Sequence, residues 1–288
     1  MAGAGSAKAF HNYGIAGNPA RGAGEMAVRI HPTAIVDPGA ELADGVEIGA
    51  FCIVSSRARL AENVRLISHV SVAGSTTIGA RTVIYPFATL GHPPQDNKYK
   101  GEDTQLIVGT DNQIREGASL HLGTVQGRGR TVVGNKCFIM NGAHVGHDGL
   151  VGDGVTYATH AVTGGLAIVE DSVILGGNSA VHQLGRVGMG AFIGGCAPVV
   201  GDVIPYGMVD NTGGLHGLNI VGLKRRNVSR ETIHLLRNIY QVLFHGAGYF
   251  EDRLASVAER HSDVPEVKRI LDFIDAGDKR PLCVPRHS

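Results

Sequence analysis

The chain has 288 residues with 26 basic and 26 acidic side chains, so its formal net charge at pH 7 is zero. Balanced charge without a dense basic run argues against nucleic-acid binding. No stretch approaches the roughly 18 apolar residues that a membrane-spanning helix needs. The 42 glycines and the lack of tryptophan indicate a fold built of small turns rather than a large globular core.

The N-terminal segment, residues 1–27, is rich in glycine and alanine and has no apolar run of the signal-peptide type. We interpret it as a flexible leader, with Met26 as an alternative start. The cysteines show no paired spacing, which predicts buried reduced thiols and a cytoplasmic protein rather than disulfides or a zinc site. They are Cys52, Cys137, Cys196 and Cys283.

From Ile30 to Val199 the sequence repeats every six residues. The first position of each hexad is aliphatic in an unbroken series from Ile30 to Leu90. The same phase returns from Val108 to Leu120, slips by one residue and runs again from Val133. The fifth position is mostly small. Such hexads are typical of a parallel β-helix, in which each hexad makes one short strand and one turn. We therefore predict a parallel β-helix over residues 28–205, with residues 18 apart stacked about 4.8 Å from one another.

Glycine is frequent at the second hexad position, as at Gly49 and Gly79. We expect these glycines to provide the permissive backbone that tight corners need. Two segments interrupt the repeat, namely the polar, proline-rich residues 91–105 and the shorter residues 124–131, where the phase slips. We predict that both are loops projecting from the β-helix, where binding groups are often found.

Beyond Pro205 the period of six fades, and helical spacing begins after Ser229, a suitable N-cap. The pattern predicts one helix starting there, a second over residues 249–260 and a third from Pro265, because proline suits a first helical turn. We predict that residues 206–288 form a connector and a C-terminal helical domain. This domain would cap the open end of the β-helix and cover its last strand edges.

The segment from His144 to Asp148 contains the sharpest candidate chemistry, because His147 is followed directly by a carboxylate. His147, Gly165 and Gln183 are 18 residues apart and share the third hexad position, so they should form a ladder. A histidine beside a carboxylate can act as a general base. Gly165 would let a backbone N–H approach a reacting carbonyl, and Gln183 could contact a sugar or an ester.

The same residues allow other interpretations. The histidines could be solvated turn residues, or they could hold zinc between neighbouring coils, as in β-helical carbonic anhydrases. The loop residues Gln95, Asp96 and Lys98 could bind phosphate or sugar, or could be solvated. A basic cluster near Asn219 could hold a nucleotide diphosphate through its arginines, or could simply precede the helical tail; it comprises Lys224, Arg225 and Arg226.

Six runs carry a recognisable resemblance: PPQDNKYKGE (93–102), LHLGTVQG (120–127), NGAHVGHD (141–148), AVHQ (180–183), IGGC (193–196) and NIVGLKRRNVSRE (219–231). In residues, order and spacing they resemble the UDP-N-acetylglucosamine acyltransferase family, across about residues 28–275. The resemblance implies a homotrimer of left-handed parallel β-helices with helical C-terminal caps and active sites between subunits. It also implies transfer of an (R)-3-hydroxyacyl chain from acyl carrier protein to the 3-position of UDP-N-acetylglucosamine, the first step of lipid A biosynthesis, without a metal or organic cofactor.

The resemblance also implies residue roles. His147 corresponds to the general base, Asp148 to the residue that orients it and Gly165 to the oxyanion donor. Gly195 corresponds to the floor of the acyl pocket, where glycine implies room for a long chain. The positions implied to bind substrate are Gln95, Asp96, Lys98, His121, His144, His182, Gln183, Asn219, Arg225 and Arg226. A basic rim for the acidic carrier protein would include Arg186 and Lys224.

Some positions depart from the family pattern. Leu166 replaces a histidine that commonly follows the oxyanion glycine, Leu122 replaces an arginine, Val221 replaces a glutamate, and the stretch 210–214 differs. A less polar site suits a more nucleophilic acceptor, so an alternative acceptor is the 3-amino group of a UDP-2,3-diamino sugar. The related N-acyltransferase of the next step carries an extra N-terminal domain, which the short leader argues against. A zinc enzyme and a non-catalytic scaffold remain as further alternatives.

Overall fold

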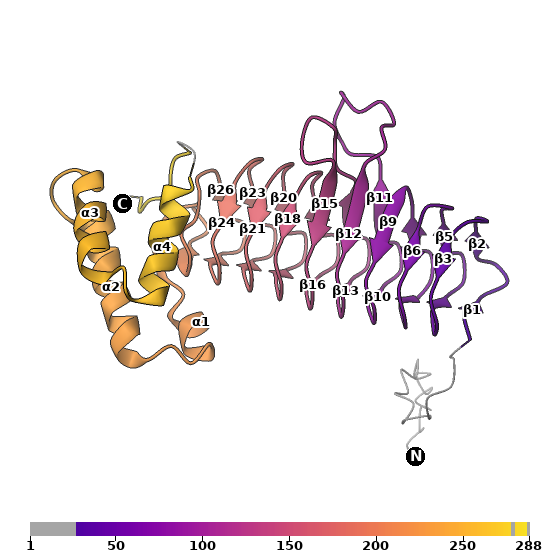
Figure 1. The fold of residues 1–288 in the computed structure, drawn as a ribbon, viewed down its shortest axis with the longest axis horizontal. Helices are drawn as coiled ribbons and strands as arrows, with labels where there is room; N and C mark the ends of the chain where they lie inside the picture. The colour runs from indigo at the N-terminus through magenta and orange to yellow at the C-terminus, as the bar shows by residue number, and fades with distance from the viewer. Residues whose placement is uncertain (1–26, 278–279, 287–288) are drawn as a thin grey trace, which may run out of the picture.

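The computed structural model describes residues 27–277 and 280–286. The predicted flexible leader therefore lies almost wholly outside the described residues. The chain winds into a long prism whose three faces are parallel β-sheets, and helices close one end (Figure 1). None of the helices in the described part is long and apolar enough to span a bilayer.

The strands of each coil join three sheets. The first sheet comprises β1 (Arg29–Ile30), β4 (Glu47–Ile48), β7 (Arg65–Leu66), β10 (Val83–Ile84), β13 (Gln113–Ile114), β16 (Phe138–Ile139), β19 (Thr156–Tyr157), β22 (Ile174–Leu175), β25 (Phe192–Ile193), β27 (Gly207–Val209) and β28 (Leu215–Leu218). The second comprises β2 (Ile35–Val36), β5 (Ile53–Val54), β8 (Ser71–Val72), β11 (Thr89–His92), β14 (Ser119–His121), β17 (His144–Val145), β20 (Val162–Thr163), β23 (Ala180–Val181) and β26 (Pro198–Val199). The third comprises β3 (Glu41–Leu42), β6 (Arg59–Leu60), β9 (Ser75–Ile78), β12 (Gln105–Val108), β15 (Arg130–Val133), β18 (Leu150–Val151), β21 (Ile168–Val169) and β24 (Arg186–Val187).

The register repeats every coil, so that Ile139 pairs with Tyr157 and Tyr157 with Leu175. It also continues across both interruptions, because Ile84 pairs with Ile114 and Ile114 with Ile139. The prediction of a left-handed parallel β-helix is confirmed. Loops 91–105 and 124–131 project together from one side of the prism (Figure 1).

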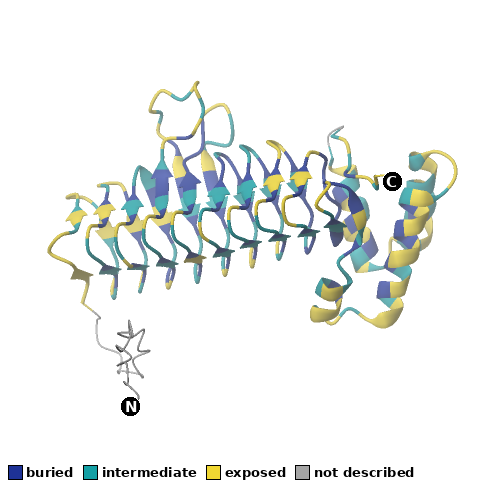
Figure 2. Cartoon of the chain, turned by 180° about the vertical axis from the view of Figure 1, so that it is seen from behind, coloured by how far each residue is buried: buried dark blue, intermediate teal, exposed yellow. Residues whose placement is uncertain are grey.

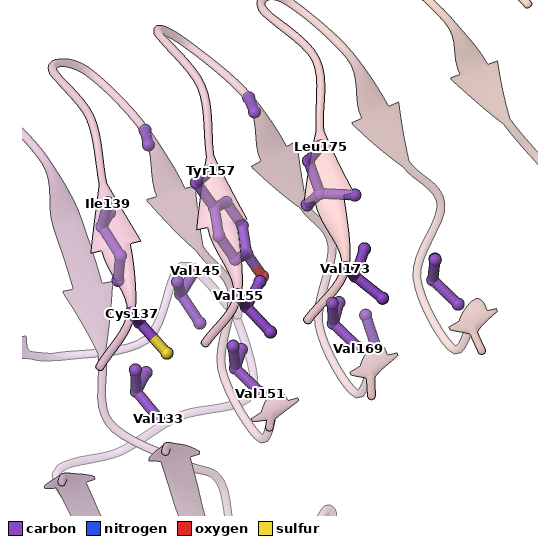
Figure 3. Packing of buried hydrophobic residues seen from close by; sticks show 14 of the residues in the cluster. Val133, Cys137, Ile139, Val145, Val151, Val155, Tyr157, Val169, Val173 and Leu175 are labelled. Carbon is purple, nitrogen blue, oxygen red and sulfur yellow. The ribbon is translucent and has the colours of Figure 1, made fainter. Parts of the chain in front are cut away.

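The side chains at the first hexad position fill the interior of the prism. Figure 3 shows Ile139, Tyr157 and Leu175 stacked on successive coils. Tyr157 is fully buried, and its hydroxyl lies 3.2 Å from Oγ1 of Thr163, which is also buried. These two residues break the aliphatic pattern together because each supplies the hydrogen-bond partner that the other needs inside the core.

The glycines at the second hexad position have a different role from the one that we expected. Gly49 and Gly79 do not adopt a positive φ. A Cβ at Gly49 would instead overlap the carbonyl oxygen of Ile67 on the next coil. The left-handed conformation falls at the fourth position, as at Phe51 and Asp148. These second-position glycines are therefore required by the close approach of the next coil, and the expectation of conformational freedom is wrong.

The four cysteines are free. Cys52, Cys137 and Cys283 are buried, and burial raises the pKa of the Cys137 and Cys283 thiols to about 11. Cys196 is exposed at a corner of the prism, which corrects the expectation that all four thiols are buried.

The C-terminal region begins with an antiparallel pair, β27 and β28, at the end of the first sheet. Four helices follow: α1 (Ile220–Arg225), α2 (Arg230–His245), α3 (Phe250–His261) and α4 (Pro265–Asp275). Ser229 caps α2 as expected, since its hydroxyl accepts a hydrogen bond from the Thr232 N–H at 3.1 Å. The short helix α1 was not predicted. Figure 2 shows buried residues on helix faces beyond the last coils, where the domain covers the end of the prism.

A buried carboxylate joins the helical domain to the last coils. Asp202 is fully buried, and its oxygens lie 3.0 Å from Nε of Arg186 and 3.1 Å from Nε of Arg280. The Arg186 guanidinium also lies 4.1 Å above the ring of Phe273 in α4 and donates to the Phe273 carbonyl. Arg186 is therefore an anchor for α4. Only 13% of its side chain is exposed, so Arg186 contributes little surface charge to the expected basic rim.

We predict that Arg186→Met destabilises the protein by about 1.5–3 kcal/mol, because Asp202 keeps Arg280 but loses one of its two charged partners. Lys268→Ala is the matched control, since Lys268 pairs with Asp272 on the exposed face of α4 and its loss should cost less than about 1 kcal/mol. Urea unfolding followed by circular dichroism measures both. Equal effects of the two substitutions would contradict the anchoring role.

Candidate active site

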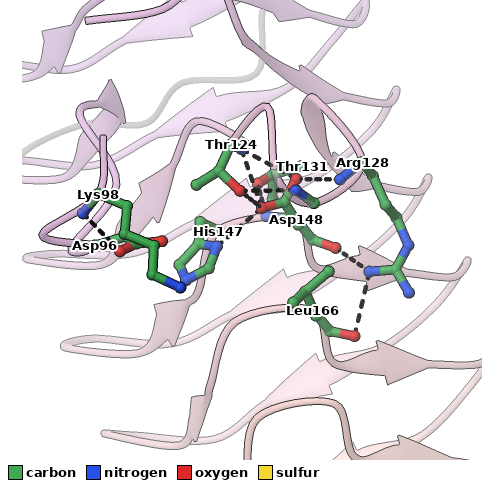
Figure 4. Close-up of polar contacts among 9 residues, drawn as sticks. Asp96, Lys98, Thr124, Arg128, Thr131, His147, Asp148 and Leu166 are labelled. Carbon is green, nitrogen blue, oxygen red and sulfur yellow. Dashed lines mark hydrogen bonds and ion pairs between the residues drawn. The ribbon is translucent and has the colours of Figure 1, made fainter. Parts of the chain in front are cut away.

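His147 lies at the second corner of the prism, by which we mean the turns that follow the strands of the second sheet. Its Nδ1 lies 2.9 Å from Oδ2 of Asp148, whose side chain is fully buried (Figure 4). An ionised carboxylate only accepts hydrogen bonds, so the His147 Nδ1–H donates to Asp148. The other ring nitrogen, Nε2, keeps its lone pair. This is the arrangement that a general base requires.

Loop 124–131 holds Asp148 in place. The Thr124 N–H and hydroxyl donate to Oδ2 at 3.0 and 2.7 Å, and the Arg128 N–H donates to Oδ1 at 2.7 Å. Burial opposes ionisation of Asp148, but the hydrogen bonds from His147, Thr124 and Arg128 together hold its pKa below the usual value. The Asp148 N–H in turn donates to Thr131 Oγ1 at 2.8 Å.

Sequence reasoning predicted this loop but not the residues that hold Asp148. The available signal was the phase slip, because it places residues 124–131 directly beside the coil that carries His147. The identity of the contacting residues was not readable from the period. Thr124, Arg128 and Thr131 therefore join the site only through the structure.

Gly165 lies on the next coil, directly beneath the His147 ring. The Leu166 N–H donates to the His147 carbonyl at 2.8 Å, and the Leu184 N–H donates to the Gly165 carbonyl at 2.9 Å. These bonds stack His147, Gly165 and Gln183 in the expected ladder. A Cβ at Gly165 would overlap Nε2 of His147. Glycine at this position is therefore what lets the basic nitrogen approach the backbone of the neighbouring coil.

A row of histidines on the second sheet leads toward this corner. His144 Nδ1 lies 2.9 Å from the Ser119 hydroxyl, and His121 Nδ1–H donates to the Pro93 carbonyl at 2.8 Å. The His121 and His144 ring centroids are 5.2 Å apart. Burial, together with the positive charges that His121 and His147 can carry, lowers the pKa of His144 to about 4. His144 is therefore neutral at neutral pH.

His92 belongs to the same row and was not predicted. It lies in β11, pairs with His121 beyond a register shift that follows Leu90, and has its Nε2 2.9 Å from the Ser71 hydroxyl. Burial, with the charge of His121, lowers the pKa of His92. The sequence shows His92 at the start of the predicted loop 91–105. That prediction assigned His92 to the projecting segment rather than to a strand, so it was not considered with the other histidines.

The projecting loop brings further predicted residues to this region. The Lys98 N–H donates to Asp96 Oδ1 at 2.9 Å, which closes a tight turn. In Figure 4 the Lys98 side chain extends from the loop toward His147. Gln95 is exposed. His182, exposed at the second corner, donates from Nδ1 to the Gln183 carbonyl at 3.1 Å.

Other predicted residues lie at different corners. Gly195 is at the first corner, which follows the first sheet, and stacks on Gly177. The third corner, which follows the third sheet, carries the basic cluster. There Asn219 Nδ2 donates to the Gly190 carbonyl at 2.9 Å, and Arg226 donates to the Ser172 carbonyl at 3.3 Å.

One chain therefore does not bring the residues predicted to bind the nucleotide and the acyl chain to His147. Asn219 also caps α1, because its Oδ1 accepts from the Gly222 N–H at 2.9 Å. Arg225 is exposed at the end of that helix. Across residues 27–277 and 280–286, no three His, Cys, Asp or Glu side chains are grouped as metal ligands would be.

The shifted pKa of His144 predicts a pH dependence of stability. Between pH 6.5 and about 4 the unfolded chain binds a proton at His144 that the folded chain does not, so acidification through this window favours unfolding. We expect the thermal midpoint to fall less from pH 7 to about pH 5 in His144→Gln than in the unsubstituted protein. His234→Gln, at an exposed position on α2, should behave like the unsubstituted protein. An unchanged slope in His144→Gln would contradict the prediction.

Comparisons with known proteins point to one family. The model of a family described as UDP N-acetylglucosamine O-acyltransferase, domain 2, matches residues 202–283. A curated relative from Azorhizobium caulinodans, named acyl-[acyl-carrier-protein]–UDP-N-acetylglucosamine O-acyltransferase, is 52% identical over 89% of this chain and 95% of its own. A relative of the same name from Caulobacter vibrioides is 51% identical over 89% of this chain and 98% of its own.

Solved structures give the same result. The UDP-N-acetylglucosamine acyltransferase of Francisella novicida is 33% identical, with a TM-score of 0.85 over 88% of this chain and 93% of its own. The UDP-N-acetylglucosamine O-acyltransferase of Moraxella catarrhalis is 38% identical, also with a TM-score of 0.85, over 88% of this chain and 99% of its own. The chain belongs to the UDP-N-acetylglucosamine O-acyltransferase family.

Proposed function

We propose that this protein transfers an (R)-3-hydroxyacyl chain from acyl carrier protein to the 3-hydroxyl group of UDP-N-acetylglucosamine, the first step of lipid A biosynthesis. The observation that supports it most strongly, besides the family, is the contact between His147 and Gly165. The free Nε2 of His147 lies against the backbone of Gly165, with Nδ1 held by the buried Asp148. In our proposal, this base and the Gly165 N–H act on the same reacting group.

The chemistry follows from this arrangement. Nε2 of His147 removes the proton from the sugar 3-hydroxyl as its oxygen bonds to the thioester carbonyl carbon. Negative charge collects on the carbonyl oxygen, which accepts a hydrogen bond from the Gly165 N–H. The carbon–sulfur bond then breaks, and His147 returns the proton to the leaving thiolate. Asp148 stabilises the imidazolium between these two steps.

The reaction needs no added cofactor, because the thioester is already activated and proton transfer suffices. We therefore propose that neither a metal nor an organic cofactor takes part. We also propose a cytoplasmic location, which the four free cysteines support.

We further propose that the protein acts as a homotrimer. Gly195 and His147 lie on two different corners and Arg226 contacts the third, which supports this, since a neighbouring copy can bring another corner to His147. The acidic carrier protein requires a basic docking surface, and Lys224 and Arg225 offer one because both are exposed on α1.

A second acceptor deserves a direct comparison. Leu166 directly follows the proposed oxyanion donor Gly165 in sequence, and an apolar residue at this position suits the 3-amino group of a UDP-2,3-diamino sugar. An amine is a better nucleophile than a hydroxyl, so it needs less polar assistance. A strong preference for the hydroxyl sugar in kcat/KM would exclude this alternative.

We expect His147→Ala to lower acyl transfer by roughly 10²–10⁴-fold, because it removes the general base. The assay detects acylated UDP-sugars by mass spectrometry, using a panel of 3-hydroxyacyl carrier proteins with UDP-N-acetylglucosamine or its 3-amino analogue. His31→Ala is the control, since His31 is an exposed histidine of the first coil.

Two outcomes of this assay would contradict the proposal. Transfer that persists unchanged in His147→Ala would show that His147 is not the base. Absence of transfer to either sugar, with stoichiometric zinc in the purified protein, would favour the carbonic-anhydrase-like alternative instead.

A further inference from the structure

Arg128 makes two separate attachments to the coils that carry the site. Its backbone N–H donates to Asp148 Oδ1 at 2.7 Å. Its side chain reaches in another direction, where Nη1 donates both to the backbone carbonyl of Asp148 and, at 3.2 Å, to the backbone carbonyl of Leu166 (Figure 4). A single guanidinium nitrogen thus joins two successive coils of the β-helix.

The two carbonyls belong to the residues that directly follow the reacting groups. Asp148 follows His147 on one coil, and Leu166 follows Gly165 on the next. Both Asp148 and Leu166 have a left-handed backbone, with φ of 58° and 63°. The same left-handed conformation recurs at the fourth hexad position of other turns, as at Phe51 and Ser172. It costs energy for residues with a side chain, so contacts from neighbouring residues help to stabilise it. The bridge from Arg128 supplies such a contact to both turns at once.

The bridge is additional to the hydrogen bonds that build the fold. The coils are already stacked at this corner by the backbone bond from Leu166 to His147. Charge-assisted bonds from a guanidinium to the two carbonyls restrain the lateral spacing and tilt of the two turns. That spacing determines how Nε2 of His147 lies relative to the N–H of Gly165.

We infer that Arg128 is a positioning residue, which aligns the general base of one coil with the oxyanion donor of the next. This inference rests on the proposed function. It assigns no contact between Arg128 and substrate. The effect on catalysis is transmitted through the backbone of Asp148 and Leu166.

A substitution at position 128 can remove the side-chain contacts without removing the backbone contact. Arg128→Ala removes the guanidinium but keeps the N–H that binds Asp148, so the carboxylate retains its backbone donor. We expect kcat to fall by about 10- to 100-fold, as misplacement of catalytic groups does, with KM for the UDP-sugar within about twofold of the unsubstituted value. Arg128→Lys should recover part of this loss, because an ammonium can still donate to a carbonyl.

Arg130→Ala is the matched control. Arg130 lies two residues further along, at the start of β15, with an exposed side chain. It should leave kcat unchanged. Each kcat is divided by the concentration of folded protein, which circular dichroism measures at the assay temperature. A loss of stability is then not mistaken for a loss of alignment between His147 and Gly165.

A double substitution distinguishes positioning from an independent structural effect. If Arg128 acts by aligning His147 with Gly165, then adding Arg128→Ala to His147→Ala should cost little further activity. A kcat for Arg128→Ala within about twofold of the unsubstituted value would overturn the inference. So would losses that multiply in the double variant, or no recovery with lysine. Full activity in His147→Ala would instead overturn the proposed function, and the inference with it.

Discussion

The hydrogen-bonded register between successive coils is the constraint on which the site depends. Because each residue stacks on the residue one coil later, His147, Gly165 and Gln183 are held at one corner although they are far apart in sequence. The same register brings the His147 ring so close to the next coil that only glycine fits beneath it. A tight solenoid therefore provides at one point both the close approach and the rigidity that the proposed proton transfer and oxyanion stabilisation require.

The irregular segments between and after the coils supply contacts that the register alone does not provide. The coil places His147, but the buried carboxylate that orients it is held by Thr124 and Arg128, which lie in an interruption of the repeat. At the far end, Asp202 binds Arg186 and thereby attaches α4 to the last coils. The regular coils therefore determine where the functional side chains lie, and the irregular segments hold them in their orientation. The fold also separates the predicted nucleotide-binding residues from the proposed base His147, because the three corners of one prism point in different directions. For this reason we propose that each site is shared between neighbouring copies.

The period of six was enough to predict the β-helix, its two projecting loops and the ladder of His147 and Gly165, because stacking depends only on sequence spacing. The helix cap at Ser229 could also be predicted, because the signal for a cap lies in the neighbouring sequence. The contacts of Arg128, the strand position of His92 and the anchoring role of Arg186 were not readable. Each depends on the path of an irregular segment or on packing between distant elements. Neither the path nor the packing produces a repeat in the sequence from which it could be predicted.

The most direct test of a site shared between copies is complementation between two inactive variants. One chain would carry His147→Ala, and the other would carry Arg225→Ala with Arg226→Ala; each alone should be nearly inactive. If neighbouring copies supply the base and the arginines to one site, co-expression and mixed assembly should restore acyl transfer, because some sites combine intact residues from both chains. If mixed assemblies form and remain as inactive as the parent variants, the site is not shared and the account is contradicted.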